Sequence, residues 1–228
     1  MQKKIENNDL LIILLPGMDG TGELFRWFRE CLGDNFKAEM VIYPEDTEQD
    51  YDNLAIWVMS IIGSRRVLLL GESFSGPIAI KTAALIPKQI EGLILVSTFV
   101  RPVFPKFLIR FASKFELSKI PMLLRKFFLF GISPKLEVAE KFESVITKCE
   151  DKTMKKRIAA VANCDVGSVF QNLQIPILCL HGTRDLIVRK PLSHSNATIK
   201  MVDAPHMLLQ TQPLIASEIV KEFISTIS

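Results

Sequence analysis

A serine in a short, glycine-flanked turn is the strongest chemical signal in the sequence. Ser73 lies within the string GESFSG, residues 71–76, which follows the apolar run Val67–Leu70 and precedes an apolar stretch with helical spacing. A serine in such a strand-to-helix turn is held exposed at the end of the strand, where it can attack a carbonyl carbon. The start of the following helix also favours developing negative charge. Ser73 is therefore predicted to be a nucleophile.

The motif departs from the pattern G-x-S-x-G at its last position, where Ser75 stands in place of glycine. Because serine is small, we expect only a modest adjustment of the backbone. Ser75 is an alternative nucleophile, but its own second neighbour is Pro77, which is bulky for that position. A chance occurrence of the string in an ordinary turn is the other alternative, so the prediction needs partner residues.

A base and an acid that could activate Ser73 come late in the chain. His206 follows the strand-like run Thr198–Val202, and Asp185 follows the run Ile177–Leu180. Both residues should therefore lie at the same edge of a parallel sheet as Ser73. His206 is predicted to accept the serine proton, and Asp185 is predicted to orient the imidazole and stabilise its charged form.

Other residues compete for these two roles. Asp203 is a rival acid, but it lies only three residues before His206, which suits helix capping better than orienting the ring. The chain has two further histidines. His181 ends a predicted strand and is expected to be structural, whereas His194 lies in a polar stretch and is expected to be exposed.

A glycine-rich loop follows the first predicted strand. Its sequence is LPGMDGTG, residues 15–22, and glycines let such a loop curl close to a substrate. The backbone N–H groups of Met18 and Phe74 are predicted to form an oxyanion hole. Phosphate binding is the alternative, but the glycine spacing matches neither G-x-G-x-x-G nor a loop that ends in GK[ST].

Strand-like apolar runs alternate with helical patterns in the first hundred residues and again after residue 162. Continuous Val/Ile/Leu runs are typical of buried parallel strands. The predicted strands are 10–15, 39–43, 66–70, 90–96, 175–180 and 198–202, and the predicted helices are 23–32, 54–62, 78–86, 166–173 and 213–227. This order predicts an α/β fold, a doubly wound and mainly parallel sheet of about six strands, in one domain over residues 1–228.

A helical insertion interrupts that alternation. Between residues 101 and 162 only helical patterns occur, at 107–115, 122–130, 136–148 and 152–162. Residues 101–157 carry 14 Lys or Arg and 6 Asp or Glu. The rest of the chain carries 14 Lys or Arg and 19 Asp or Glu. We therefore expect a basic helical cap, residues 101–162, on an acidic body.

Four segments resemble the α/β-hydrolase superfamily in sequence and order: LLPGMDGTGELF, LLLGESFSGPIAI, HGTRDLIV and DAPHMLLQTQP. The grouping is similar to small bacterial serine hydrolases, such as the esterases that demethylate pimeloyl-carrier-protein methyl ester in biotin synthesis. The resemblance implies the catalytic triad Ser73, Asp185 and His206, and a basic cap that binds acyl carrier protein. Arg110, Arg125 and Lys126 are the candidate docking residues.

Two departures from the superfamily pattern are expected. The chain starts so close to its first buried strand that the usual leading hairpin should be missing. The segment between Asp185 and His206 is also short, so its helix should be a single turn.

The predicted function is serine-dependent carboxylic ester hydrolysis through an acyl-enzyme, with a pimeloyl-carrier-protein methyl ester as the leading substrate. An acyl thioesterase, a lipid esterase or acyltransferase at a membrane surface, and a non-catalytic ligand-binding relative are the alternatives. Phenylalanines in the cap suit a membrane-facing helix, but they could equally turn inward and line an acyl tunnel.

We expect no cofactor, no metal and no nucleic acid, and a monomer. Four cysteines without paired spacing favour a reduced, cytoplasmic protein.

Overall fold

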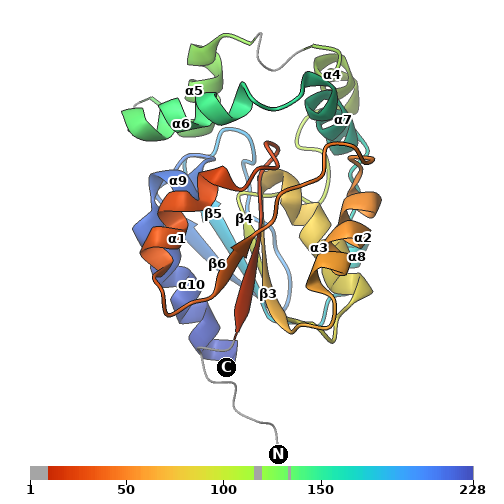
Figure 1. Ribbon diagram of the computed structural model, residues 1–228, viewed down its shortest axis with the longest axis vertical. Coiled ribbons are helices and arrows are strands. Elements are labelled where there is room, and N and C mark those ends of the chain that lie inside the picture. The colour runs from red at the N-terminus through yellow and green to blue at the C-terminus, as the bar shows by residue number, and fades with distance from the viewer. Residues whose placement is uncertain (1–9, 116–119, 133–134, 228) are drawn as a thin grey trace, which may run out of the picture.

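The computed structural model describes residues 10–115, 120–132 and 135–227. Six parallel strands form one sheet in the order β2-β1-β3-β4-β5-β6 (Figure 1). The strands are β1 (Leu11–Leu15), β2 (Ala38–Met40), β3 (Val67–Glu72), β4 (Ile90–Val96), β5 (Ile177–Gly182) and β6 (Ala197–Val202). The predicted fold class, a parallel sheet of about six strands, is confirmed.

Helices cover both faces of the sheet. The helices outside the cap are α1 (Arg26–Leu32), α2 (Tyr51–Ile62), α3 (Gly76–Leu85), α8 (Gly167–Gln171), α9 (Leu208–Thr211) and α10 (Pro213–Ile227). Leu69 of β3 packs in a core with α2, α3 and α8. Its neighbour Leu68 packs on the opposite face with α1, α9 and α10. Burial on both faces explains why central strands are rich in apolar residues, as in β1, which reads LIILL.

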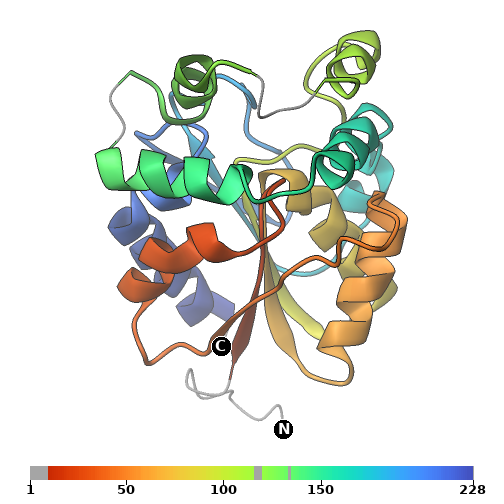
Figure 2. The same cartoon turned by 45° about the horizontal axis from the view of Figure 1, so that its top comes forward.

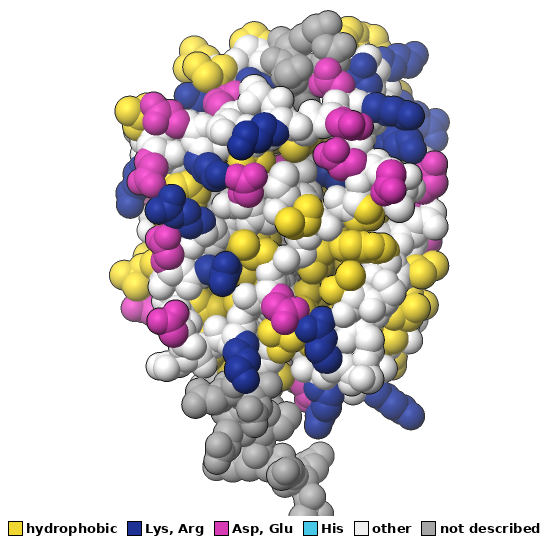
Figure 3. Space-filling view, viewed as in Figure 1, with side chains coloured by type: hydrophobic (Ala, Val, Ile, Leu, Met, Phe, Trp, Pro, Cys, Tyr) yellow, Lys and Arg dark blue, Asp and Glu magenta, His cyan; other side chains and the backbone are white. Residues whose placement is uncertain are grey.

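Of the five helices that the described residues form between β4 and β5, all but α8 belong to the cap and cover the carboxyl edge of the sheet (Figures 1 and 2). They are α4 (Lys106–Ala112), α5 (Met122–Phe130), α6 (Leu136–Ile146) and α7 (Asp151–Ala162). Phe130 and Phe142 pack with Met154 in a small core of their own, which reaches Leu24 and Met207 of the body. Hydrophobic side chains also reach the surface at this end of the molecule (Figure 3).

The connection from β5 to β6 differs from its prediction. Residues 186–196 contain no helix, so the one-turn helix expected there is wrong. Asp185 Oδ1 accepts the N–H groups of Ile187 and Val188, which closes a turn, and Pro191 follows where a helix would have to continue. A short helix instead follows His206, as α9.

None of the described helices has both the length and the apolar character needed to cross a lipid bilayer.

The first residue of α3 packs directly on the loop after β4. A Cβ atom at Gly76 would lie 2.0 Å from Thr98 Oγ1, and that hydroxyl donates a hydrogen bond to the carbonyl of Ser73. We predict that Gly76→Ala lowers the free energy of unfolding by about 1–3 kcal/mol, because the methyl group must displace Thr98. Chemical denaturation measures the change.

Gly17→Ala is the matched control, since its Cβ would meet only Asp19 Oδ1, at 3.4 Å. This variant should change stability by less than about 0.5 kcal/mol. Equal unfolding free energies for the two variants would contradict the prediction.

Candidate active site

Ser73 lies in a strained turn between β3 and α3. A short 3₁₀ turn over Ser73–Ser75 joins the two elements, and Ser73 has a φ of 50°, in the left-handed region. Few residues other than glycine adopt this conformation, and those that do are frequent at functional sites. A Cβ at Gly71 would lie 2.7 Å from the carbonyl oxygen of Ser75, so the tight turn requires glycine there.

Ser75 has a structural role. Its side chain is fully buried, and its hydroxyl lies 2.5 Å from the hydroxyl of Tyr43 and donates to the carbonyl of Pro16. Ser75 therefore joins the nucleophile turn to the loop after β1 and has no access to a substrate. These hydrogen bonds also give a physical reason for serine in place of the usual glycine.

Three predicted residues form one chain of hydrogen bonds. Ser73 Oγ lies 2.9 Å from His206 Nε2, and His206 Nδ1 lies 2.8 Å from Asp185 Oδ2. The other oxygen of Asp185 accepts the N–H groups of Ile187 and Val188, at 2.8 and 2.9 Å. The carboxylate is thus held in place and can orient the imidazole, which in turn can accept the serine proton.

The competing residues lie elsewhere. Asp203 is exposed and pairs with Arg184 at 2.6 Å, so it does not contact His206 through its carboxylate. His181 is buried within β5, and burial lowers its pKa. The expectation that His194 is exposed is wrong: its ring is buried against Phe170, with 5.0 Å between ring centroids.

Two backbone N–H groups remain unpaired beside Ser73. Within the described residues, neither the N–H of Met18 nor that of Phe74 donates a hydrogen bond to a protein oxygen. Both residues line the cavity that contains Ser73 and His206. Unpaired donors at this place are suited to the negative oxygen that develops when a serine attacks a carbonyl group.

That cavity has a volume of about 510 Å³ and is mainly apolar. Body residues such as Leu24 and Met207 form its inner wall, and cap residues such as Leu108, Leu124 and Phe128 form its outer part. A site with an apolar wall and a few polar groups at one end is suited to an acyl chain whose carbonyl group lies beside Ser73.

A buried arginine of the cap holds the loop that carries Met18. Arg157 of α7 is 1% exposed, and its Nη1 donates to the carbonyls of Met18 and Asp19, at 2.9 and 2.8 Å. Its Nε donates to Gln49 Oε1 at 2.9 Å. A Cβ at Gly20 would lie 2.3 Å from this guanidinium, so glycine lets the loop approach it. Sequence reasoning missed Arg157, although a charge on the apolar face of α7, between Met154 and Val161, was a usable signal.

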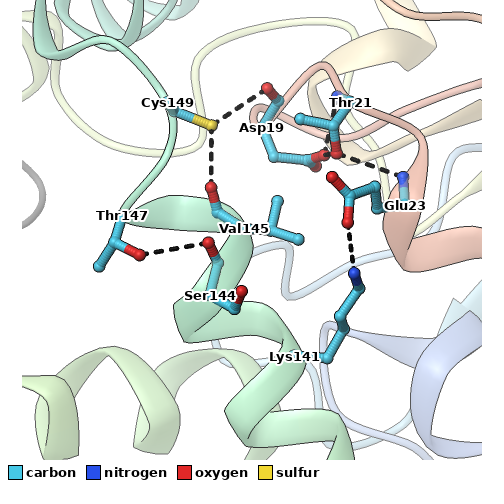
Figure 4. A network of polar contacts seen from close by, with 8 residues as sticks. All are labelled: Asp19, Thr21, Glu23, Lys141, Ser144, Val145, Thr147 and Cys149. Carbon is cyan, nitrogen blue, oxygen red and sulfur yellow. Dashed lines mark hydrogen bonds and ion pairs between the residues drawn. The ribbon is translucent and has the colours of Figure 1, made fainter.

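The cap makes further contacts with the same loop (Figure 4). Lys141 of α6 forms an ion pair with Glu23, and Cys149 Sγ lies 3.4 Å from the carbonyl oxygen of Asp19. Within the loop, the carboxylate of Asp19 accepts the N–H and the hydroxyl of Thr21, at 2.9 and 2.7 Å. The loop conformation therefore depends on the cap as well as on the body.

A second residue missed by the sequence reasoning adjoins the nucleophile. Glu72 is buried, lines the cavity and accepts hydrogen bonds from Gln210 Nε2 at 3.1 and 3.3 Å. Burial raises its pKa to about 8, against the lowering effect of the Gln210 hydrogen bond. At neutral pH this carboxyl group is therefore mostly uncharged, and it adds little negative charge beside Ser73.

The three candidate docking residues differ in position. Arg110 on α4 is exposed and donates to Asn163 Oδ1 at 3.2 Å. Lys126 on α5 is partly exposed. Arg125 is buried and pairs with Glu143 at 2.7 Å, so its inclusion as a surface docking residue is wrong.

Solved structures with the same architecture are numerous. The chain superposes on an esterase from Exiguobacterium antarcticum with a TM-score of 0.83, at 17% identity over 95% of this chain and 92% of the esterase. A hydrolase from Oleispira antarctica superposes with a TM-score of 0.81, at 14% identity over 95% of this chain and 91% of the hydrolase. The enol-lactonase from Burkholderia xenovorans LB400 superposes with a TM-score of 0.80, at 15% identity over 96% of this chain and 92% of the lactonase. The fold is that of the α/β hydrolases.

The family follows from the sequence. Residues 44–213 match the family described as Serine aminopeptidase, S33, which is about three quarters of the chain. The protein belongs to this family and is a hydrolase. No curated protein shows significant sequence similarity to the chain.

The raised pKa of Glu72 should make stability depend on pH. Between about pH 4.5 and about pH 8 the folded protein keeps a proton that the unfolded chain releases. Folding then binds a proton, so this group's contribution to the free energy of unfolding is lost as the pH rises through that range. Glu72→Gln cannot titrate and should show a smaller loss than the wild type, as measured by urea denaturation at a series of pH values. Parallel pH profiles for the two proteins would contradict this.

Arg157→Met should lower kcat for ester hydrolysis by roughly 10–100-fold with little change in KM. The carbonyls of Met18 and Asp19 lose their hydrogen bonds to the guanidinium, so the N–H of Met18 is no longer held in place. Arg157→Lys should recover part of the loss, since an amine can still donate to both carbonyls. Lys156→Met, at a neighbouring surface position that pairs with Glu48, is the control. An unchanged kcat in folded Arg157→Met, with only its melting temperature lowered, would show that the role is purely structural.

Proposed function

We propose that this protein is a serine-dependent carboxylic ester hydrolase that acts on esters with an apolar acyl chain. One observation carries the proposal: the hydrogen-bonded chain from Asp185 through His206 to Ser73 ends in an apolar cavity beside two unpaired N–H groups. The esterase and the enol-lactonase among the structural neighbours support this reaction type.

The geometry supports a two-step reaction. Ser73 Oγ attacks the ester carbonyl carbon while its proton passes to His206 Nε2, and the N–H groups of Met18 and Phe74 stabilise the oxyanion. Collapse of this intermediate breaks the bond to the alcohol, which leaves with the proton from His206. A water molecule then attacks the acyl-enzyme, His206 takes its proton, and the acid leaves as Ser73 is restored.

Aminopeptidase activity is the function that the family description names. An aminopeptidase must bind the positively charged α-amino group of its substrate, which calls for an available negative charge near the nucleophile. The two acidic side chains that line the cavity fit this poorly. Glu72 has a pKa of about 8, and the carboxylate of Asp19 is already hydrogen-bonded to Thr21. An apolar ester suits the cavity better.

A carrier-linked ester, such as pimeloyl-carrier-protein methyl ester, is a narrower candidate. Its apolar chain suits the cavity, and the exposed charge of Arg110 on the cap would attract an acidic carrier. Arg125 contributes nothing to such docking, because it is buried in an ion pair with Glu143.

Labelling with a fluorophosphonate probe tests the nucleophile. We expect one adduct, located on Ser73 by peptide mass spectrometry, and hydrolysis of p-nitrophenyl esters that improves as the acyl chain lengthens. Ser73→Ala should abolish labelling and lower kcat by roughly 10⁴-fold or more. Ser75→Ala is the matched control and should still be labelled at Ser73. An adduct on another residue, or faster cleavage of aminoacyl arylamides than of any ester, would refute the proposal.

A further inference from the structure

Large apolar side chains are concentrated on the outer surface of the cap. On and beside α4 and α5 the exposed ones are Phe104, Phe107, Leu108, Phe111, Phe115, Met122, Leu123, Leu124, Phe127, Phe128 and Ile132. Phe107 is 70% exposed and Leu123 is 80% exposed. We call these eleven side chains the cap face; Figure 3 shows hydrophobic side chains at this end of the molecule. Exposed apolar area on this scale marks an interaction site.

The same part of the chain is strongly basic. Residues 101–135 contain eight Lys or Arg and a single acidic residue. Lys106, Arg110 and Lys114 are exposed on α4 or just after it, in the same segment as Phe107 and Phe111. A helix surface that combines phenylalanine and leucine with lysine and arginine is typical of proteins that insert shallowly into an anionic lipid surface.

The cap face is continuous with the catalytic cavity. Phe104, Leu108, Leu124 and Phe128 belong to the cap face and also line the cavity that reaches Ser73. Phe107, Phe111 and Leu123 do not line the cavity and are available to a partner. The outer apolar surface and the wall of the cavity beside Ser73 therefore share four side chains.

We propose that the cap face binds the surface of an anionic lipid bilayer, and that the acyl ester enters the cavity from that bilayer. The second part rests on the proposed esterase function, whereas the first does not. Basic residues would attract the anionic headgroups, and the exposed phenylalanine and leucine side chains would insert among the acyl chains. An acidic carrier protein would use the charges but would leave most of this apolar area without a partner.

Vesicle binding by the Ser73→Ala protein tests the docking separately from catalysis. Co-sedimentation should show binding to phosphatidylcholine vesicles that contain about 30% phosphatidylglycerol, and much weaker binding to phosphatidylcholine alone. Adding Phe107→Ser and Leu123→Ser should weaken binding by roughly tenfold or more, because two inserted side chains are lost. Lys106→Glu with Lys114→Glu should weaken it too, as should raising NaCl from about 0.1 M to about 0.5 M.

Ile56→Ser with Leu214→Ser is the matched control, since these side chains are 52% and 57% exposed but lie on α2 and α10 of the body. The Ser73→Ala protein with these two changes should bind vesicles as strongly as the Ser73→Ala protein without them. Vesicle binding that is absent, or that survives the cap-face changes, would overturn the proposal. Binding of an acidic acyl carrier protein to the cap face in place of vesicles would overturn it as well.

Activity on a soluble short-chain ester separates the two proposals. With Ser73 present, Phe107→Ser and Leu123→Ser should leave this activity unchanged, while hydrolysis of esters embedded in anionic vesicles falls with binding. Retained ester hydrolysis without vesicle binding would refute the docking alone. Vesicle binding by a protein that cleaves no ester would support the docking and refute the proposed function.

Discussion

Parallel pairing within one sheet brings the reactive groups together. β3 pairs with β4, β4 with β5 and β5 with β6, so Glu72 lies opposite Val96 and Gly182 lies opposite Val202. All these strands end at the same edge, and the residues that follow them share it. Ser73 and His206 are 133 positions apart in the chain, yet their side chains are within hydrogen-bond distance. A register shift in any one pair would displace a member of this group.

The cap covers the candidate active site and also contacts the loop that carries Met18. On its inner side, the buried guanidinium of Arg157 binds two carbonyls of the loop after β1, and Lys141 pairs with Glu23 of the same region. On its outer side, the cap presents apolar and basic side chains to the surroundings. A movement of the cap would therefore reach the loop that carries Met18 through these direct contacts.

Local pattern was enough to predict most of the fold, and it selected three side chains, Ser73, His206 and Asp185, that the structure places within hydrogen-bond distance of one another. Buried strands contain continuous apolar runs, and the turn around Ser73 needs small residues, so both leave a strong sequence signal. Exposure of individual side chains was harder to predict, because it depends on the packing of distant elements. His194 lies in a polar stretch yet packs on Phe170, and Arg125 lies in a basic segment yet pairs with Glu143. The raised pKa of Glu72 likewise comes from its burial, which spacing does not reveal.

Placing the cap between β4 and β5 also bears on how the chain folds. About 80 residues separate Val96 from Ile177, and the pairing of these two strands closes a loop that contains the whole cap. Contacts between such distant segments form slowly, because the chain must lose the entropy of the loop before it gains the contact. Asp185 and His206 follow that closure and come from the last quarter of the chain. A ribosome-bound chain would therefore carry Ser73 in an incomplete site until the segment with Asp185 and His206 had also emerged, which delays any hydrolytic activity to that point of synthesis.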